Sequence, residues 1–192
     1  MTKFKKIVIL GFSLLFAGTL TACATTPKTE LPSKDFSVTI NDSTYSIPFK
    51  VNDLINNDVT IYTDTNGTDL YTVDETFYNI QAQAKNQDLF TIDVKTGSTA
   101  EEQGDNAMVV GLHLQSYDNN LNTAKIGGSL LLNQSTIADV TAKYGKDYVV
   151  QQGNIDKPDR DVIIITYTME GKLLTFYFFE GKISGFEIVI ND

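Results

Sequence analysis

The sequence predicts an α+β fold, mainly antiparallel sheet with one or two short helices, and three observations support this prediction. Apolar and polar residues alternate in most segments after residue 36, as half-buried strands require. Glycine stands in each short connection within residues 161–192, where tight hairpins need a positive φ. Residues 136–145 combine a helical apolar stripe with a capping-box-like start and a glycine stop.

The first 22 residues have the order of an export signal. Lys3, Lys5 and Lys6 precede an apolar run over residues 7–20, with no acidic residue among them. That run is shorter than the roughly 20 residues that a membrane-spanning helix needs. We therefore expect residues 1–22 to be a signal peptide.

The signal ends in Leu20-Thr21-Ala22-Cys23, which resembles the lipobox of bacterial lipoproteins. That resemblance implies a diacylglycerol on the sulfur of Cys23, cleavage before it, and a lipid anchor on the outer, extracytoplasmic face of the cell membrane. Cys23 is the only cysteine of the chain, so no disulfide competes for it. Two acyl chains make a stable anchor where one is marginal. An ordinary secretory signal followed by an unlipidated cysteine is the alternative.

Residues 23–35 are predicted to be the lipidated cysteine and a flexible tether, since residues 24–35 hold two of the four prolines and few apolar residues. Twelve such residues reach roughly 20 Å. Removing residues 1–22 leaves 15 − 3 = 12 basic and 24 acidic residues, a formal charge of about −12. A basic surface for nucleic acid is therefore not expected.

Residues 36–117 are predicted to form a β-rich N-terminal subdomain. Its expected elements are a hairpin over residues 36–47, a short helix from Val51 to about Asn57, a strand over residues 59–62, a turn at Asn66-Gly67, and strands over residues 77–84, 90–94 and 108–114. The Ala and Gln content of residues 77–84 also suits a helix, but alternation favours a strand with Tyr78, Ile80 and Ala82 on one face. Met108, Val110 and the two following leucines are expected to share a face likewise.

Residues 124–192 are predicted to form a second, helix-plus-meander module, which a polar loop at residues 118–123 separates from the first. Thr136 and Asp139 start the helix, Val140 and Tyr144 lie on its apolar face, and Gly145 ends it. Three strands follow, over residues 162–167, 173–179 and 183–190. A helix must cover one face of so small a sheet.

Residues 127–146 and the later Phe179-Glu180-Gly181-Lys182-Ile183 resemble a small module of helix, Tyr-Gly and meander. The module occurs in the SmpA/BamE type of outer-membrane-assembly lipoproteins, in beta-lactamase-inhibitory proteins and in Firmicute lipoproteins. Here Asp147 stands where a proline is usual. The resemblance implies an α+β binding or scaffolding module with no catalytic residues. Residues 36–62 share a few positions with that module, so two related subdomains are an alternative to one domain.

Few residues suggest catalysis or metal binding. His113, the only histidine, is expected on the strand face opposite Leu112 and Leu114, and no Gly-Xaa-Ser-Xaa-Gly nucleophile motif accompanies it. One histidine without a free cysteine is a poor zinc set. Residues 64–75 are rich in oxygen ligands but fail the EF-hand pattern, so a turn is favoured over calcium.

The sequence therefore predicts a non-enzymatic lipoprotein of the bacterial envelope that binds another envelope protein, with no cofactor and no nucleic acid. Two alternatives remain. One is an envelope or cell-wall hydrolase that uses a carboxylate pair with raised pKa values. The other is an inhibitor of a secreted hydrolase, which binds through exposed aromatic residues such as Tyr117 or Tyr148.

Overall fold

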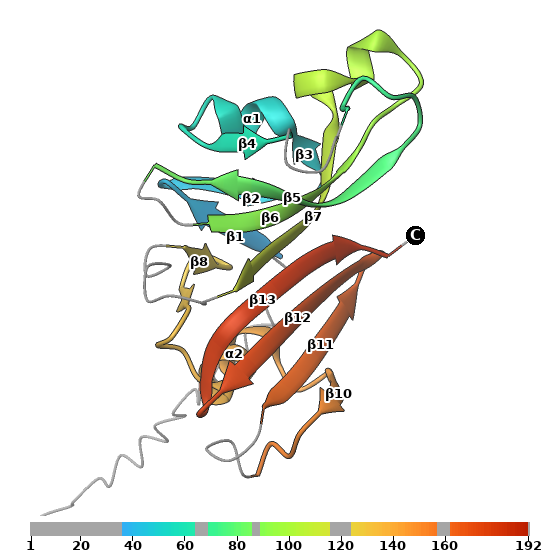
Figure 1. Cartoon of the computed structure of the whole chain (residues 1–192). Coiled ribbons are helices and arrows are strands. Elements are labelled where there is room, and N and C mark those ends of the chain that lie inside the picture. The colour runs from blue at the N-terminus through green and yellow to red at the C-terminus, as the bar shows by residue number, and fades with distance from the viewer. Residues whose placement is uncertain (1–35, 64–68, 86–88, 116–123, 157–161, 192) are drawn as a thin grey trace, which may run out of the picture. The chain divides into compact units, whose positions relative to one another are not determined.

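The computed structural model describes residues 36–63, 69–85, 89–115, 124–156 and 162–191 (Figure 1), all within the compact unit of residues 32–192. The predicted signal peptide, Cys23, the tether, the Asn66-Gly67 turn, Tyr117 and the loop at residues 118–123 lie outside these described residues.

Most strands belong to one large antiparallel sheet. Its order is β10 (Val149–Gln152), β11 (Ile163–Met169), β12 (Lys172–Phe179), β13 (Lys182–Ile190), β7 (Met108–Gln115), β6 (Leu89–Lys95), β5 (Thr76–Gln83) and β4 (Thr60–Tyr62), and β3 (Phe49–Lys50) also pairs with β7. The meander at the C-terminus thus joins the strands of the N-terminal half through the β7–β13 pairing.

A small sheet also combines both halves of the chain. Its order is β2 (Ser43–Ser46), β1 (Ser37–Ile40), β8 (Lys125–Ile126) and β9 (Leu130–Leu131). The predicted hairpin is confirmed, and its turn residues Asn41 and Asp42 both have positive φ, as a two-residue hairpin loop of the primed type requires. Strands that precede residue 116 and strands that follow residue 123 therefore contribute to both sheets.

Both predicted helices are confirmed as α1 (Val51–Ile55) and α2 (Ile137–Tyr144), and two single-turn 3₁₀ helices, η2 (Ala100–Glu102) and η3 (Gly104–Asn106), precede β7. The Thr136 backbone N–H donates to the Asp139 carboxylate at 2.8 Å, and the Asp139 N–H donates to the Thr136 hydroxyl at 3.3 Å. Gly145 ends α2 at a φ of 85°. The capping box and the glycine stop are therefore those that the sequence predicted.

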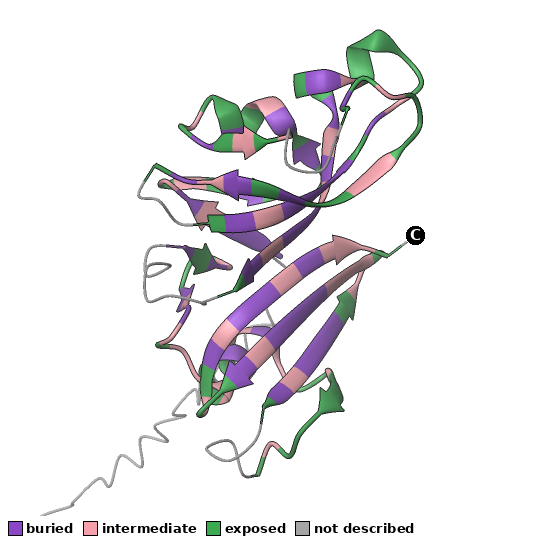
Figure 2. Cartoon of the chain, in the orientation of Figure 1, coloured by how far each residue is buried: buried purple, intermediate pink, exposed green. Residues whose placement is uncertain are grey.

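Buried residues alternate with more exposed ones along much of β6, β7 and β13 (Figure 2), so one face of the large sheet carries the hydrophobic core. Tyr144 of α2 packs on Tyr167 and Phe176, with ring centroids 5.5 and 5.9 Å apart. Val38 of the small sheet belongs to the same core. In Figure 1, α2 lies behind the meander, and none of the described helices lies in front of β11, β12 and β13. We call this uncovered side, to which the alternate residues point, the open face.

The predicted strands over residues 77–84 and 108–114 are confirmed as β5 and β7, but the predicted faces are partly wrong. A register shift between Phe77 and Ile80 leaves Tyr78 exposed while Ile80 is buried. A second shift opposite β6 buries Val109 in place of Val110. Each extra residue of a β-bulge reverses the alternation beyond it, which periodicity alone does not reveal.

Candidate functional site

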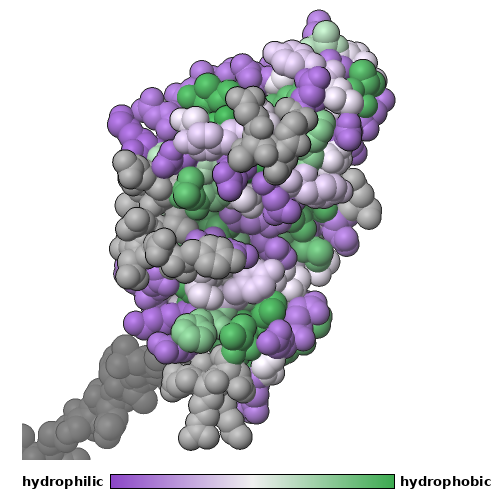
Figure 3. Space-filling model, in the orientation of Figure 1, coloured by the Kyte–Doolittle hydropathy of each residue, from purple (hydrophilic) through white to green (hydrophobic). Residues whose placement is uncertain are grey.

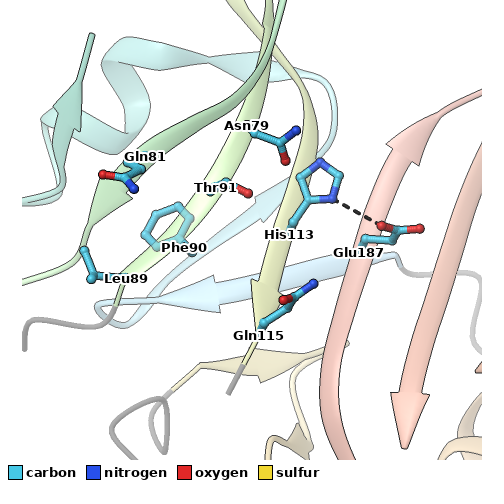
Figure 4. Close-up of a pocket in the computed structure, with 8 residues that line it drawn as sticks. All are labelled: Asn79, Gln81, Leu89, Phe90, Thr91, His113, Gln115 and Glu187. Carbon is cyan, nitrogen blue, oxygen red and sulfur yellow. Dashed lines mark hydrogen bonds and ion pairs between the residues drawn. The ribbon is translucent and has the colours of Figure 1, made fainter. Parts of the chain in front are cut away.

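The candidate site is a hollow of about 580 Å³ on the open face, where β5, β6, β7 and β13 lie next to one another (Figure 4). Its volume is within the range of small-ligand sites, about 300–1,000 Å³. Amide, hydroxyl and charged side chains dominate the lining, which consists of Asn79, Gln81, Leu89, Phe90, Thr91, His113, Gln115 and Glu187.

Strand register places a row of polar residues through this hollow and across the sheet. Consecutive members are cross-strand partners, and the row runs Gln81, Thr91, His113, Glu187, Thr175 and Thr166. We call this set the polar row. Directly opposed residues in antiparallel strands have Cβ atoms about 5 Å apart, so neighbours in the row can interact. Figure 3 shows that hydrophilic side chains make up much of the surface on this side.

His113 joins two carboxylates within the hollow. Its Nε2 lies 2.8 Å from Oδ2 of Asp93, and its Nδ1 lies 3.3 Å from Oε2 of Glu187. The side chains of His113, Asp93 and Glu187 are 18%, 9% and 29% exposed. Because both ring nitrogens face a carboxylate, the doubly protonated imidazolium satisfies the geometry best.

The pKa values of His113, Asp93 and Glu187 are all shifted in the direction that favours their charged forms. Burial by itself would lower the pKa of His113, but the hydrogen bonds to Asp93 and Glu187 raise it to about 9. Burial opposes ionisation of Asp93 as well, yet the bond from His113 holds its pKa below the usual value. The bond from His113 likewise lowers the pKa of Glu187. At neutral pH one cation thus lies between two anions.

Asp93 is held in place by the two bulges. The backbone N–H of Asn79, which has a φ of 57°, donates to Oδ1 of Asp93 at 2.9 Å. On the other side Gly111 lies under the carboxylate, and a Cβ at that position would overlap it. One bulge supplies a hydrogen-bond donor, and the glycine beside the other leaves space, so the carboxylate of Asp93 is accommodated within β6.

We call His113, Asp93 and Glu187 the charged cluster; further side chains contact it on both sides of His113. Asp93 also lines a second hollow of about 300 Å³ together with Thr76, Tyr78, Lys95, Val110, Val189 and Ile190. Tyr177 and Thr175 donate hydrogen bonds to Glu187. Burial, and then the charge of Glu187, raise the pKa of Tyr177 to about 12. Glu187 is therefore held by three donors from two strands, β7 and β12.

Of the residues that the sequence singled out for function, the structure describes His113 and Tyr148. His113 lies opposite the buried Leu112 and Leu114, as expected, but it is ion-paired rather than free in solvent. Sequence reasoning missed Asp93 and Glu187; the one available signal was an acid inside the apolar stretch Phe90-Thr91-Ile92-Asp93-Val94. Tyr148 is half-buried against Tyr167, with ring centroids 5.5 Å apart.

The part of the chain that the structure describes contains no candidate metal site. No group of three or more His, Cys, Asp or Glu side chains there is placed to hold an ion. The pair of carboxylates around His113 is occupied by the imidazolium instead.

Comparison with protein-family models, with curated proteins and with solved structures found no match. Among the described residues, no helix has the length and apolar character needed to cross a membrane.

Proposed function

We propose that this chain is a non-enzymatic lipoprotein, anchored through Cys23 on the outer face of a bacterial membrane, whose folded domain binds another envelope protein. The lipobox-like segment and the tether support the location. The helix-plus-meander resemblance supports a binding or scaffolding role. The observation that carries the proposal is the free edge of the large sheet at β10.

Strand β10 forms the end of the sheet order, so among the described strands only β11 pairs with it. All four of its residues are exposed, and none of them is charged. Natural edge strands usually carry charges, prolines or covers that block pairing with other chains. An uncharged, exposed edge of Val149, Val150, Gln151 and Gln152 instead suits the addition of an extended segment from a partner.

The carboxylates of the candidate site favour binding over hydrolysis. A hydrolase with a carboxylate pair needs one acid that keeps its proton near neutral pH, and hence a raised pKa. In Asp93 and Glu187 both pKa values are lowered. His113, whose pKa is about 9, holds its proton in hydrogen bonds to the same two acids.

The test is crosslinking on intact cells followed by affinity capture and mass spectrometry of the tagged chain. Cys23→Ala removes the proposed anchor, and Val149→Lys places a charge on the β10 edge. Val73→Lys is the matched control, because Val73 is 55% exposed and Val149 is 59% exposed. We expect one envelope protein to be captured by the unaltered chain and by Val73→Lys, and to be lost with both other variants.

Capture that persists in Val149→Lys would remove β10 from the proposal. Absence of any captured protein from cells that display the chain at their surface would contradict a protein-binding role altogether. If the Cys23→Ala variant remained in the membrane fraction, this would contradict lipidation at that residue.

A further inference from the structure

The two charged side chains that line the hollow are paired with each other, and the other lining side chains are neutral. Its three amides, Asn79, Gln81 and Gln115, each offer a donor and an acceptor, and Thr91 adds a hydroxyl. The side chains of Gln81, Thr91 and Gln115 make no hydrogen bond to another described residue. The charged members, His113 and Glu187, already bind each other.

This lining discriminates between ligand classes. An anion would find no unpaired cation, since the imidazolium already lies between Asp93 and Glu187, and both acids would repel it. An apolar ligand would strip water from the amides without replacing its hydrogen bonds. Groups that both donate and accept hydrogen bonds, as neutral hydroxyls do, match the amides and Thr91.

We infer that the hollow binds a sugar unit of a neutral oligosaccharide. Figure 4 shows amide side chains around it, with Gln81 and Asn79 on one side and Gln115 on the other, and with Leu89 and Phe90 next to one another. Leu89 is largely exposed and offers apolar surface to the C–H face of a sugar ring. The volume of about 580 Å³ accommodates such a unit.

The cluster has a positioning role in this site. Glu187 is the acceptor for sugar hydroxyls, and His113 and Tyr177 fix its carboxylate from two sides. His113 has no ring N–H left for the ligand, because Asp93 takes the other one. The sugar site is independent of the β10 edge, so either proposal can fail without the other.

The experiment is isothermal titration calorimetry of the whole chain as it is purified from the producing cell, in a detergent without a sugar headgroup. The probes are an N-acetylglucosamine hexamer, a glucose hexamer joined as in starch, and inorganic phosphate. The first two separate an amino sugar of the cell-wall type from a nutrient glucan. Because His113 is the only histidine, its NMR signal gives a second readout of binding next to it.

The double variant Gln81→Leu/Gln115→Leu removes two lining amides at similar volume. Gln151→Leu/Gln152→Leu makes the same changes on β10, which is also exposed and lies at the other end of the row of strands. Loss of two hydrogen bonds predicts about a tenfold or greater loss of affinity in the first variant. The second variant should bind as the unaltered chain does.

Binding of either hexamer with this pattern supports the inference and identifies the sugar class. Binding of phosphate alone, no binding of either hexamer at millimolar concentration, or equal binding by both double variants would each overturn it. Unchanged thermal unfolding midpoints show that a loss of affinity does not come from loss of the fold.

Discussion

The two halves of the large sheet differ in where their register shifts lie. In the half of β10 to β13, β11 and β12 pair over seven consecutive positions without a shift, and the shifts of β10–β11 and β12–β13 lie near strand ends. In the half of β4 to β7, β5–β6 and β6–β7 each contain a register shift, and these two shifts meet around Asp93. We call the first the regular half, which buries aromatic rings, and the second the irregular half, which buries a charge.

This difference between the two halves indicates which part of the sheet can hold a polar site. In the meander the outward Thr166 and Thr175 hydroxyls lie 3.0 Å apart and hydrogen bond to each other. Among β5, β6 and β7, one bulge turns the Asn79 N–H toward Asp93, and Gly111 beside the other leaves space for the carboxylate. Bulges commonly re-aim groups beside functional sites, and here they accommodate one counterion of His113, Asp93.

We expect the largest loss of stability from a substitution in the core of the regular half. Phe176→Ala empties a fully buried ring position and should lower the free energy of unfolding by about 3–5 kcal/mol. Phe179→Ala, on the same strand at 57% exposure, should change it by less than about 1 kcal/mol. Chemical denaturation measures both, and equal losses would contradict the assigned core face.

The charged cluster should give the next largest effect, as a dependence of stability on pH. The pKa of His113 is raised from 6.5 to about 9, so its stabilisation is complete below about 6.5 and is lost as pH rises through about 9. The loss should reach about 3 kcal/mol at most. Asp93 and Glu187, whose pKa values are lowered, lose their contribution in the acid range instead.

Denaturation of the unaltered chain and of His113→Gln at several pH values from 6 to 10 isolates this contribution, because the other groups titrate in both. NMR titration of the single imidazole measures its pKa directly. A pKa near 6.5 would mean that the ion pairs do not form.

Gly111→Ala tests whether the bulge is built around Asp93. The added methyl group would overlap the carboxylate, so we expect a loss of about 1–3 kcal/mol and a lower His113 pKa. Gly111→Ala/Asp93→Ala is the control, since removal of the carboxylate relieves the overlap. The losses of stability in Gly111→Ala and in Asp93→Ala, measured separately, should sum to more than the loss in the double variant. Strict additivity would argue against the contact.

Thr166→Val should have the smallest effect of the four, about 0.5–1.5 kcal/mol, because it removes one buried hydroxyl pair within the regular half. Thr168→Val, on the same strand at an exposed position, is the matched control and should be nearly neutral. Thermal unfolding measures both. A loss above that of Gly111→Ala would reverse the ranking of the two halves.

Much of the fold could be predicted from local patterns. Glu170-Gly171 and Glu180-Gly181 indicate the meander turns, and in both pairs the two residues have positive φ. Thr136, Asp139 and Gly145 mark the ends of α2 because capping depends on groups within one helical turn. The site could not be predicted in this way, since His113 is 20 positions from Asp93 and 74 from Glu187.

The sequence by itself determined the type and place of both α-helices and the longer strands, because propensity, alternation and turn chemistry act over a few residues. It did not indicate the short strands β3, β8, β9 and β10, which have too few residues to show alternation. Only the tertiary structure decided that β7 pairs with β13 and that β1 pairs with β8. Backbone hydrogen bonds are alike for every pair of strands, so alternation identifies a strand but not its neighbour. The bulges at Asn79 and beside Asp93 reversed the faces locally, whereas the pairing of β7 with both β6 and β13 placed His113 between two acids.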